Sequence, residues 1–229
     1  MIDGILSIHK QVGITSYDVI RKLKKLLGKK EKIGHAGTLD PFASGLLIIL
    51  FGKATKMMNV FHSYKRVYEV EAELGYETDT QDVTGEIINK SKRIDIPTKD
   101  EIQDIVDSNF LGEIMQIPPR YSAKKIDGRR AYDLAREGVS FKLEPQKINI
   151  NQFEVFYYKY PFLKCKINCS SGTYVRTLIN DLGILLGTYA TCTKLIRTSV
   201  GNYNISEAVA SESIEMENRD NILRRVINI

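Results

Sequence analysis

The order of the expected strands and helices constrains the fold of this chain more than any other feature. Residues 4–9 predict a short buried strand, and residues 65–75 alternate between two kinds of side chain, as in a strand with one buried face. Two strands at about 147–158 and 162–169 are joined by a short turn, and a last strand is expected near 191–200. Helices interrupt the series without a regular strand–helix–strand rhythm. We therefore expect an α+β fold with a mixed, largely antiparallel sheet and peripheral helices.

Several segments have the signals of helices. The clearest begins after Thr98, because Glu101 three residues later completes a capping box, and it should end near Asn109. The other expected helices cover about 15–27, 53–61, 130–137 and 174–186. In the strand at 65–75, Tyr68 shares a face with the apolar residues, so its side chain should point towards a core or a cleft.

Composition excludes several classes of protein. Hydrophobic residues make up 43% of the chain and charged residues 27%, which argues against a disordered, collagen-like or coiled-coil chain. The longest apolar run, residues 46–51, is far shorter than the roughly 20 residues that a membrane-spanning helix needs. The first ten residues lack the order of a secretory signal. We therefore expect no membrane association and a cytoplasmic location.

Cysteine and histidine spacing gives no sign of a bridge or a metal. The chain has three cysteines without a C-x-x-C pair, and its three histidines are far apart. An odd number of cysteines argues against a disulfide framework, and the histidines do not have ligand spacing. We expect buried thiols and no metal site.

Separated clusters of opposite charge suggest a bound polyanion. The net charge is +5, yet residues 21–32 hold seven basic side chains and one acid. A second basic cluster lies at 120–136, whereas acids collect at 77–86, 95–107 and 207–217. Basic patches bind polyanions by neutralising phosphates and releasing counterions, so a nucleic acid is a candidate partner. The alternative is that these lysine-rich faces are only solvated surface.

The segment GHAGTLDPFASG, residues 34–45, is the strongest candidate for a functional loop. Its glycines let the backbone approach another molecule closely, and Pro41 biases Asp40 towards an extended conformation. The loop lacks the spacing of a phosphate-binding loop and places a carboxylate where an anion would sit. We therefore expect Asp40 to be functional. The alternative is a turn acid that hydrogen-bonds its own loop.

Arg176 is a second candidate, because it falls in the first turn of the helix after CSSGTYVRT. The helix dipole disfavours a cation there by about 0.3–1 kcal/mol. We therefore expect an anionic partner, either a phosphate or a carboxylate such as Asp40. The alternative is an arginine that reaches solvent from a surface turn.

Together, GHAGTLDP, KRVYEVEAELG and CSSGTYVRT resemble the three sequence motifs of the bacterial tRNA pseudouridine synthase B family. The motifs occur in the family's order, and PPRYSAKKIDGRRAYDLAREG is similar to its segment between the second and third motifs. The resemblance covers roughly residues 4–203. It implies the pseudouridine synthase fold with a central basic cleft. It also implies that the chain isomerises a uridine at position 55, in the T-arm loop of tRNA, to pseudouridine without cofactor or metal.

The resemblance implies roles for individual residues. Asp40 matches the catalytic aspartate, which would act as the nucleophile, Tyr68 matches the active-site tyrosine, and Arg176 matches the arginine that pairs with the aspartate. Extrusion of the target base into a pocket calls for a surrogate partner, and the histidine of the first motif matches that position. Substrate binding is therefore expected from this histidine, from an aromatic and an apolar pocket position, and from basic side chains: His35, Tyr174, Leu195, Lys65, Arg120 and Lys125.

We expect one catalytic domain over residues 1–229, with an RNA-contacting arm at about 118–140. The C-terminal RNA-binding domain that many relatives carry is expected to be missing. Without heptads or long edge strands, a monomer is expected. Two other hypotheses remain: a non-catalytic protein that binds and refolds tRNA, and a hydrolase that uses Asp40 on a small phosphorylated substrate. Loss of isomerisation but not of RNA folding in Asp40→Asn would separate enzyme from folding activity.

Overall fold

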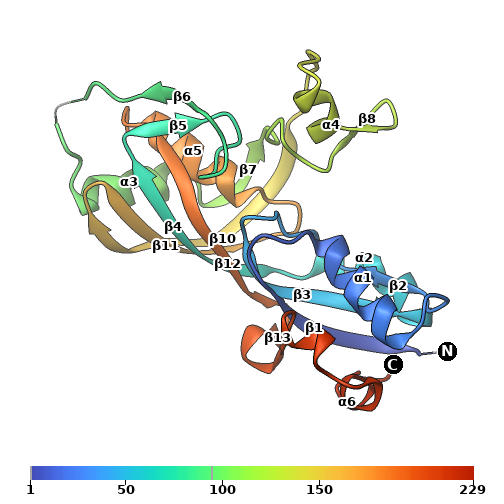
Figure 1. Ribbon diagram of the computed structural model, residues 1–229. Helices are drawn as coiled ribbons and strands as arrows, with labels where there is room; N and C mark the ends of the chain where they lie inside the picture. Colours follow the sequence, from blue (N-terminus) through green and yellow to red (C-terminus); the bar gives the residue numbers. More distant parts are fainter. Residues whose placement is uncertain (1, 94) are drawn as a thin grey trace. The chain divides into compact units, whose positions relative to one another are not determined.

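The computed structural model describes residues 2–93 and 95–229 (Figure 1). The chain divides into two compact units, one built from residues up to Glu69 together with Leu195–Ile229, the other from Val70–Lys194. Strands β4 (Arg66–Leu74) and β12 (Ala190–Val200) contribute residues to both units. One catalytic domain over 1–229 stays a prediction, because a compact unit is not by itself an independent domain.

The first unit is built around β3, whose eight residues are all buried. Strand β1 pairs antiparallel with β3 along its whole length, from Gly4↔Phe51 to Lys10↔Gly45. Strand β12 pairs with β3 in parallel, with Arg197 opposite Gly45. The order of the strands in this unit is β14, β1, β3, β12 and β4, with β2 on β3 and β13 on β12. Their bounds are β1 Gly4–Lys10, β2 Ile33–His35, β3 Ser44–Phe51, β13 Tyr203–Asn204 and β14 Val209–Ala210.

Both faces of β3 are covered, which explains its continuous apolar sequence. On one face, α1 (Ser16–Leu27) packs its apolar side against alternate residues of β1 and β3, and α6 (Arg219–Arg224) adds Ile222 to the same core. On the other face, the 3₁₀ helix η1 (Gly52–Met57) and α2 (Met58–Ser63) contribute residues such as Phe61. Helix α1 begins with a capping box between Thr15 and Asp18, as Thr15 in the sequence suggests.

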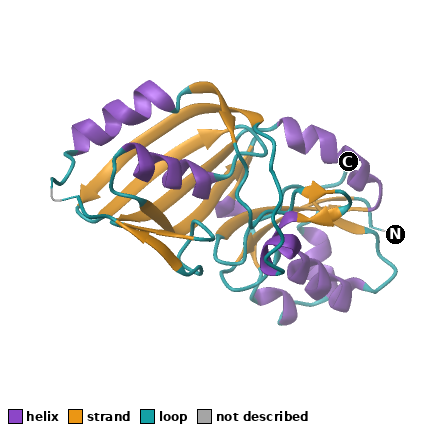
Figure 2. Cartoon of the chain, turned by 90° about the horizontal axis from the view of Figure 1, so that it is seen from above, coloured by secondary structure: helices purple, strands orange, loops and turns teal. Residues whose placement is uncertain are grey.

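The second unit has a sheet with the strand order β12, β4, β11, β10 and β7. The hairpin of β10 (Gln146–Lys159) and β11 (Phe162–Cys169) is antiparallel, and β7 (Gly112–Gln116) pairs antiparallel with β10. Figure 2 shows these strands side by side with helices running across them. Helices α3 (Lys99–Asn109) and α5 (Val175–Leu185) contact each other, and α3 also packs on β10. The predicted capping box of Thr98 and Glu101 is confirmed.

Two small hairpins complete the second unit (Figure 1). One joins β5 (Tyr76–Thr78) to β6 (Ile87–Lys90). The other, β8 (Lys125–Ile126) with β9 (Arg129–Arg130), leads into α4 (Ala131–Arg136) within the segment predicted to be an arm. None of the described helices is long and apolar enough to cross a membrane.

The predicted α+β fold with a mixed, largely antiparallel sheet is confirmed. Every strand and helix for which we predicted a residue range is present. The short strands β2, β5, β6, β8, β9, β13 and β14 were not predicted. Strand β6 shows the reason, since all four of its residues are exposed and no alternation marks them. The C-terminal segment, expected only as an acidic tail, contains α6 and the 3₁₀ helices η2 (Ile205–Glu207) and η3 (Ser213–Glu215).

Candidate functional site

The loop that carries Asp40 connects β2 to β3 in the first unit and is held from both sides. The Ser16 hydroxyl accepts a hydrogen bond from the Leu39 N–H (2.9 Å) and donates one to the Leu39 carbonyl (3.1 Å). After Asp40, the Pro41 carbonyl accepts from the Gly13 N–H at 2.7 Å, and the Ala43 N–H donates to the Asp40 carbonyl at 3.1 Å. The backbone on each side of the carboxylate is therefore tied to α1 and to the turn after β1.

Three buried cations lie in the same unit as this loop: Lys10, Arg66 and Arg197 are each at most 3% exposed. The Lys10 ammonium donates to the carbonyls of Gln11 and Ile14, both at 2.8 Å. Burial lowers the pKa of Lys10 to about 8, while the negative charge of Asp40 acts in the opposite direction and the charge of Arg197 adds to the lowering. Lys10 therefore lies within electrostatic reach of Asp40.

These cations were not predicted as part of a site. Lys10 ends a buried strand and Arg197 lies within another, where a long basic side chain usually reaches solvent. Arg197 instead donates from Nε to the Leu46 carbonyl at 2.7 Å and from Nη2 to the Gly37 carbonyl at 3.0 Å. Arg66 donates to the carbonyls of Tyr64 and Phe61. The signal in the sequence was a basic residue inside an apolar strand pattern.

His35 lies at the end of β2, half-buried, just before the Asp40 loop. Its Nδ1 atom is buried and has no hydrogen-bond partner among the described residues. Burial, and after it the charge of Arg197, lowers the pKa of His35 below its usual value. The shift favours the neutral ring, and a buried ring nitrogen without a hydrogen-bond partner among the described residues suits a ligand that donates or accepts a hydrogen bond.

Tyr68 and Leu195 also belong to the first unit. Tyr68 is 6% exposed on β4, so the predicted inward orientation of its side chain is confirmed. Leu195 is 5% exposed on β12. Lys65 precedes β4, and its carbonyl accepts from the Gly201 N–H at 2.9 Å. The first unit thus holds five of the predicted site residues, those two together with Asp40, His35 and Lys65.

Arg176 belongs to the second unit and lies in the first turn of α5, 3% exposed. Its guanidinium donates to the carbonyls of Thr80 and Tyr121, and it forms an ion pair with the equally buried Asp82, Nη1 to Oδ2, at 3.5 Å. The anionic partner predicted for a cation in this turn is therefore present in Asp82. A pairing of Arg176 with Asp40 stays a prediction.

Asp82 is a residue that the sequence interpretation missed. It lies in the loop between β5 and β6, and its Oδ1 accepts from the Thr84 N–H at 2.9 Å and from the Thr80 hydroxyl at 3.0 Å. These bonds orient the carboxylate whose other oxygen meets Arg176. The signal in the sequence was the run of threonines and aspartates in TDTQDVTG, a composition that favours side-chain to backbone bonds in turns.

The other predicted residues of the second unit lie around α5 and the arm. The Tyr174 backbone is held by Gln116, whose amide accepts from its N–H at 2.9 Å and donates to its carbonyl at 3.0 Å. Arg120 lies over the Phe141 ring at 5.1 Å, and its guanidinium donates to the Val139 carbonyl at 3.0 Å. Lys125 is exposed on β8. The basic side chains of the arm are therefore available to a polyanion.

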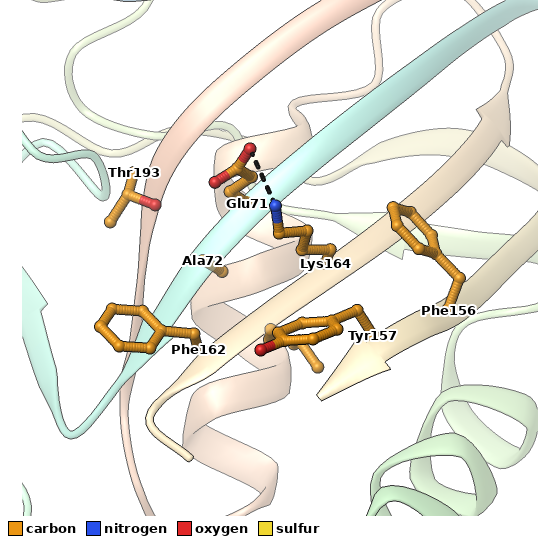
Figure 3. A pocket seen from close by; sticks show the side chains of 8 residues that line it. Glu71, Ala72, Phe156, Tyr157, Phe162, Lys164 and Thr193 are labelled. Carbon is orange, nitrogen blue, oxygen red and sulfur yellow. Dashed lines mark ion pairs between the residues drawn. The ribbon is translucent and has the colours of Figure 1, made fainter. Parts of the chain in front are cut away.

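A pocket of about 570 Å³ lies on the sheet of the second unit and contains none of the predicted site residues (Figure 3). It is lined by the Glu71–Lys164 ion pair, 3.4 Å from Oε1 to Nζ, and by the rings of Phe156, Tyr157 and Phe162. Among the described residues, no group of three or more His, Cys, Asp and Glu side chains is placed to hold a metal ion.

Comparison with known proteins places the chain among characterised sequences. The model of the TruB family pseudouridylate synthase (N terminal domain) matches residues 24–175, and that of the tRNA pseudouridylate synthase B C-terminal domain matches residues 176–228. The tRNA pseudouridine synthase B of Clostridium kluyveri is 43% identical over 227 residues, which cover 99% of this chain and 76% of that protein. The protein of the same name from Endomicrobium trichonymphae is 41% identical, with 99% and 96% covered.

A solved structure supports the same assignment. A chain of a Cbf5-Nop10-Gar1 complex matches with a TM-score of 0.71 and 26% identity. The match covers 97% of this chain but 58% of that chain, so this chain spans less than two thirds of that structural neighbour. Because one family model covers well over half of the chain and both relatives are at least 41% identical, this chain belongs to the TruB family of pseudouridylate synthases.

Proposed function

We propose that this chain isomerises the uridine at position 55, in the T-arm loop of tRNA, to pseudouridine. The reaction breaks the bond from N1 to C1′, turns the uracil over and forms a bond from C5 to C1′. The C5 hydrogen is lost to solvent and N1 gains a proton, so substrate and product are isomers and no redox partner is required. Relatives named tRNA pseudouridine synthase B, 43% and 41% identical over nearly the whole chain, support this substrate.

Asp40 acts as the nucleophile in this proposal. The supporting observation is the held loop, because bonds from Ser16 and Gly13 tie the backbone on both sides of the carboxylate. A carboxylate on a held loop near a buried cation is suited to attack at an electrophilic carbon or to stabilise an elimination, since the loop needs little reorganisation. Attack at C1′, attack at C6 and elimination to a glycal all use Asp40 in this position.

Tyr68, Arg176 and His35 complete the proposed catalytic set. Tyr68 stacks on the base and accepts or relays a proton. Arg176 matches the family's arginine and is assigned to pair with Asp40 as well as with Asp82. His35 takes the place of the base that the extruded uridine leaves, and the unbonded Nδ1 supports that role.

RNA recognition is assigned to shape and phosphate contacts. Tyr174 and Leu195 line the pocket for the base in this proposal, and Lys65, Arg120 and Lys125 contact the backbone of the T-arm. No metal or cofactor has a role in the proposed reaction. A monomeric state, a cytoplasmic location and a central basic cleft stay predictions.

The experiment is release of tritium from unmodified tRNA labelled at C5 of uridine, without added metal. Wild type should release about one equivalent per tRNA and Asp40→Asn none, whereas the matched change Asp220→Asn, an exposed acid of α6, should leave the rate unchanged. A second substrate with cytidine at position 55 should release nothing.

Two results would contradict different parts of the proposed function. If neither wild type nor Asp40→Asn releases tritium while both bind tRNA and speed its refolding, the proposal is refuted in favour of a non-catalytic RNA-folding protein. If wild type releases tritium equally from the position-55 variant, the site of modification is wrong but the reaction stands.

A further inference from the structure

Arg197 is a buried cation whose hydrogen bonds all end on the backbone around the Asp40 loop. It lies in the C-terminal half of β12, is 1% exposed and is among the largest fully buried side chains of the described chain. A buried guanidinium is costly unless its N–H groups are bonded. Those bonds go to the carbonyls of Gly37 and Thr38, at 3.0 and 3.4 Å, and to the carbonyl of Leu46 at 2.7 Å.

The three acceptors bracket Asp40 along the chain. Gly37 and Thr38 lie just before it, and Leu46 lies just after the loop has entered β3. A planar guanidinium offers several donors in fixed directions, so one side chain fixes both ends of the loop relative to each other. A lysine at the same position has three donors on one atom and cannot span the same carbonyls.

Two glycines allow the loop to approach Arg197 closely, Gly45 at its backbone and Gly37 at its side chain. Gly45 has a φ of +116°, and a Cβ there would lie 2.4 Å from the Arg197 carbonyl oxygen and 2.5 Å from its nitrogen. Gly37 has a φ of +100°, and a Cβ would lie 3.1 Å from the guanidinium of Arg66 and 3.5 Å from that of Arg197. Only glycine adopts these conformations freely without a clash. The glycines of the loop therefore permit its close contact with Arg197.

We propose that Arg197 is a positioning residue for the isomerisation: it holds the loop so that the Asp40 carboxylate meets the ribose or base in the reactive geometry. Because Arg197 is buried, it acts through the loop and not by contact with RNA. The inference rests on the proposed function of Asp40. A displacement of about 1 Å at a reacting group commonly costs on the order of 100-fold in rate.

The test separates the chemical step from RNA binding in the full chain. For Arg197→Lys, single-turnover tritium release at saturating enzyme should slow by about 100-fold, while the Kd for tRNA stays within about threefold of wild type. For Arg197→Ala, guanidinium ion at non-denaturing concentrations should restore part of the rate, because the ion can occupy the emptied space. Methylammonium should not restore it.

A second pair of variants covers the case in which Arg197 variants do not fold. Gly37→Ala moves the loop against the guanidiniums and keeps every charge, so it should also slow the chemical step at unchanged Kd. Gly28→Ala is the matched control, since Gly28 has a φ of +119° but nothing within 4 Å of its Cβ position. It introduces a similar backbone strain away from the loop and should leave the rate of the folded protein unchanged.

The outcomes are distinguishable. Wild-type single-turnover rates in Arg197→Lys and Gly37→Ala, both folded, would overturn the inference. So would a rate loss matched by Gly28→Ala, or a loss that appears in Kd alone. No tritium release by wild type would instead refute the proposed function, and Asp40→Asn, which guanidinium cannot rescue, marks the fully inactive baseline.

Discussion

Lys10 should give this protein an unusual rise in stability between pH 8 and pH 10. Its ammonium is fully buried, and burial lowers its pKa from 10.5 to about 8. Between these two values the unfolded chain binds the proton and the folded chain does not, so the free energy of unfolding increases with pH. The full shift corresponds to about 3 kcal/mol, and the interval from pH 7.5 to 9.5 captures about 2 kcal/mol of it.

The assay is urea unfolding at several pH values on wild type, Lys10→Met and Lys29→Met. Lys29 is an exposed lysine of the basic cluster at 21–32 and serves as the control. Near pH 7, wild type and Lys10→Met should be similar in stability. Methionine removes the cost of a buried charge, but it also loses the bonds to the Gln11 and Ile14 carbonyls. At pH 9.5 wild type should gain about 2 kcal/mol over Lys10→Met, and Lys29→Met should follow wild type.

Coupling to Asp40 sharpens this prediction. The carboxylate raises the pKa of Lys10 against the effects of burial and of Arg197, with a smaller contribution from Asp18. In Asp40→Asn the rise in stability should therefore begin at a lower pH than in wild type. A stability difference between wild type and Lys10→Met that stays constant within about 0.5 kcal/mol from pH 7.5 to 9.5 would show that Lys10 titrates normally, and the reasoning would be wrong.

Three further substitutions test other contacts. Ser16→Ala removes both bonds to Leu39, so it should cost about 1–3 kcal/mol in urea unfolding and slow tritium release; unchanged values for both would contradict the holding role of this hydroxyl. Asp82→Asn removes the charge that pairs with Arg176 in the second unit, so a loss of about 1.5–3 kcal/mol in urea unfolding is expected, and a loss below about 1 kcal/mol would refute the structural role of this pair. Glu71→Gln breaks surface ion pairs with two lysines and should cost less than about 1 kcal/mol in thermal unfolding; a larger loss would mean that the pair is not solvent-screened.

Elements were predictable from sequence where local signals and burial agree. The capping box at Thr98, the alternation around Tyr68 and the continuous apolar run of β3 each mark an element that the structure contains. Short strands such as β6 were not predictable, because exposed residues without alternation carry no periodic signal and their pairing is set by the hairpin around them. The core residues of the C-terminal segment were missed for a similar reason. Ile214 and Ile222 are buried, but they stand apart in the sequence and form no periodic pattern.

The candidate site also contains residues that were predictable from sequence and residues that were not. Asp40 and Arg176 stand out because each breaks a local rule: one places a carboxylate in a glycine-rich loop, the other places a cation at the start of a helix. The residues near them follow no local sequence pattern. Lys10 of β1 and Arg197 of β12 lie near the Asp40 loop, and Asp82, from the loop after β5, pairs with Arg176. Such contacts arise from long-range packing, so sequence reasoning finds the residue that breaks a rule and misses the residues that compensate for it.

The buried cations Lys10 and Arg197 are hydrogen-bonded to backbone carbonyls, and this has a consequence for catalysis. Lys10 and Arg197 satisfy their donors on carbonyl oxygens, so their bonds leave their positive charges in place. The Asp40 loop therefore lies near buried basic groups whose positions are set by hydrogen bonds to the backbone. Such charges are in place before RNA arrives and need no rearrangement to act on negative charge that develops near the loop in the proposed reaction.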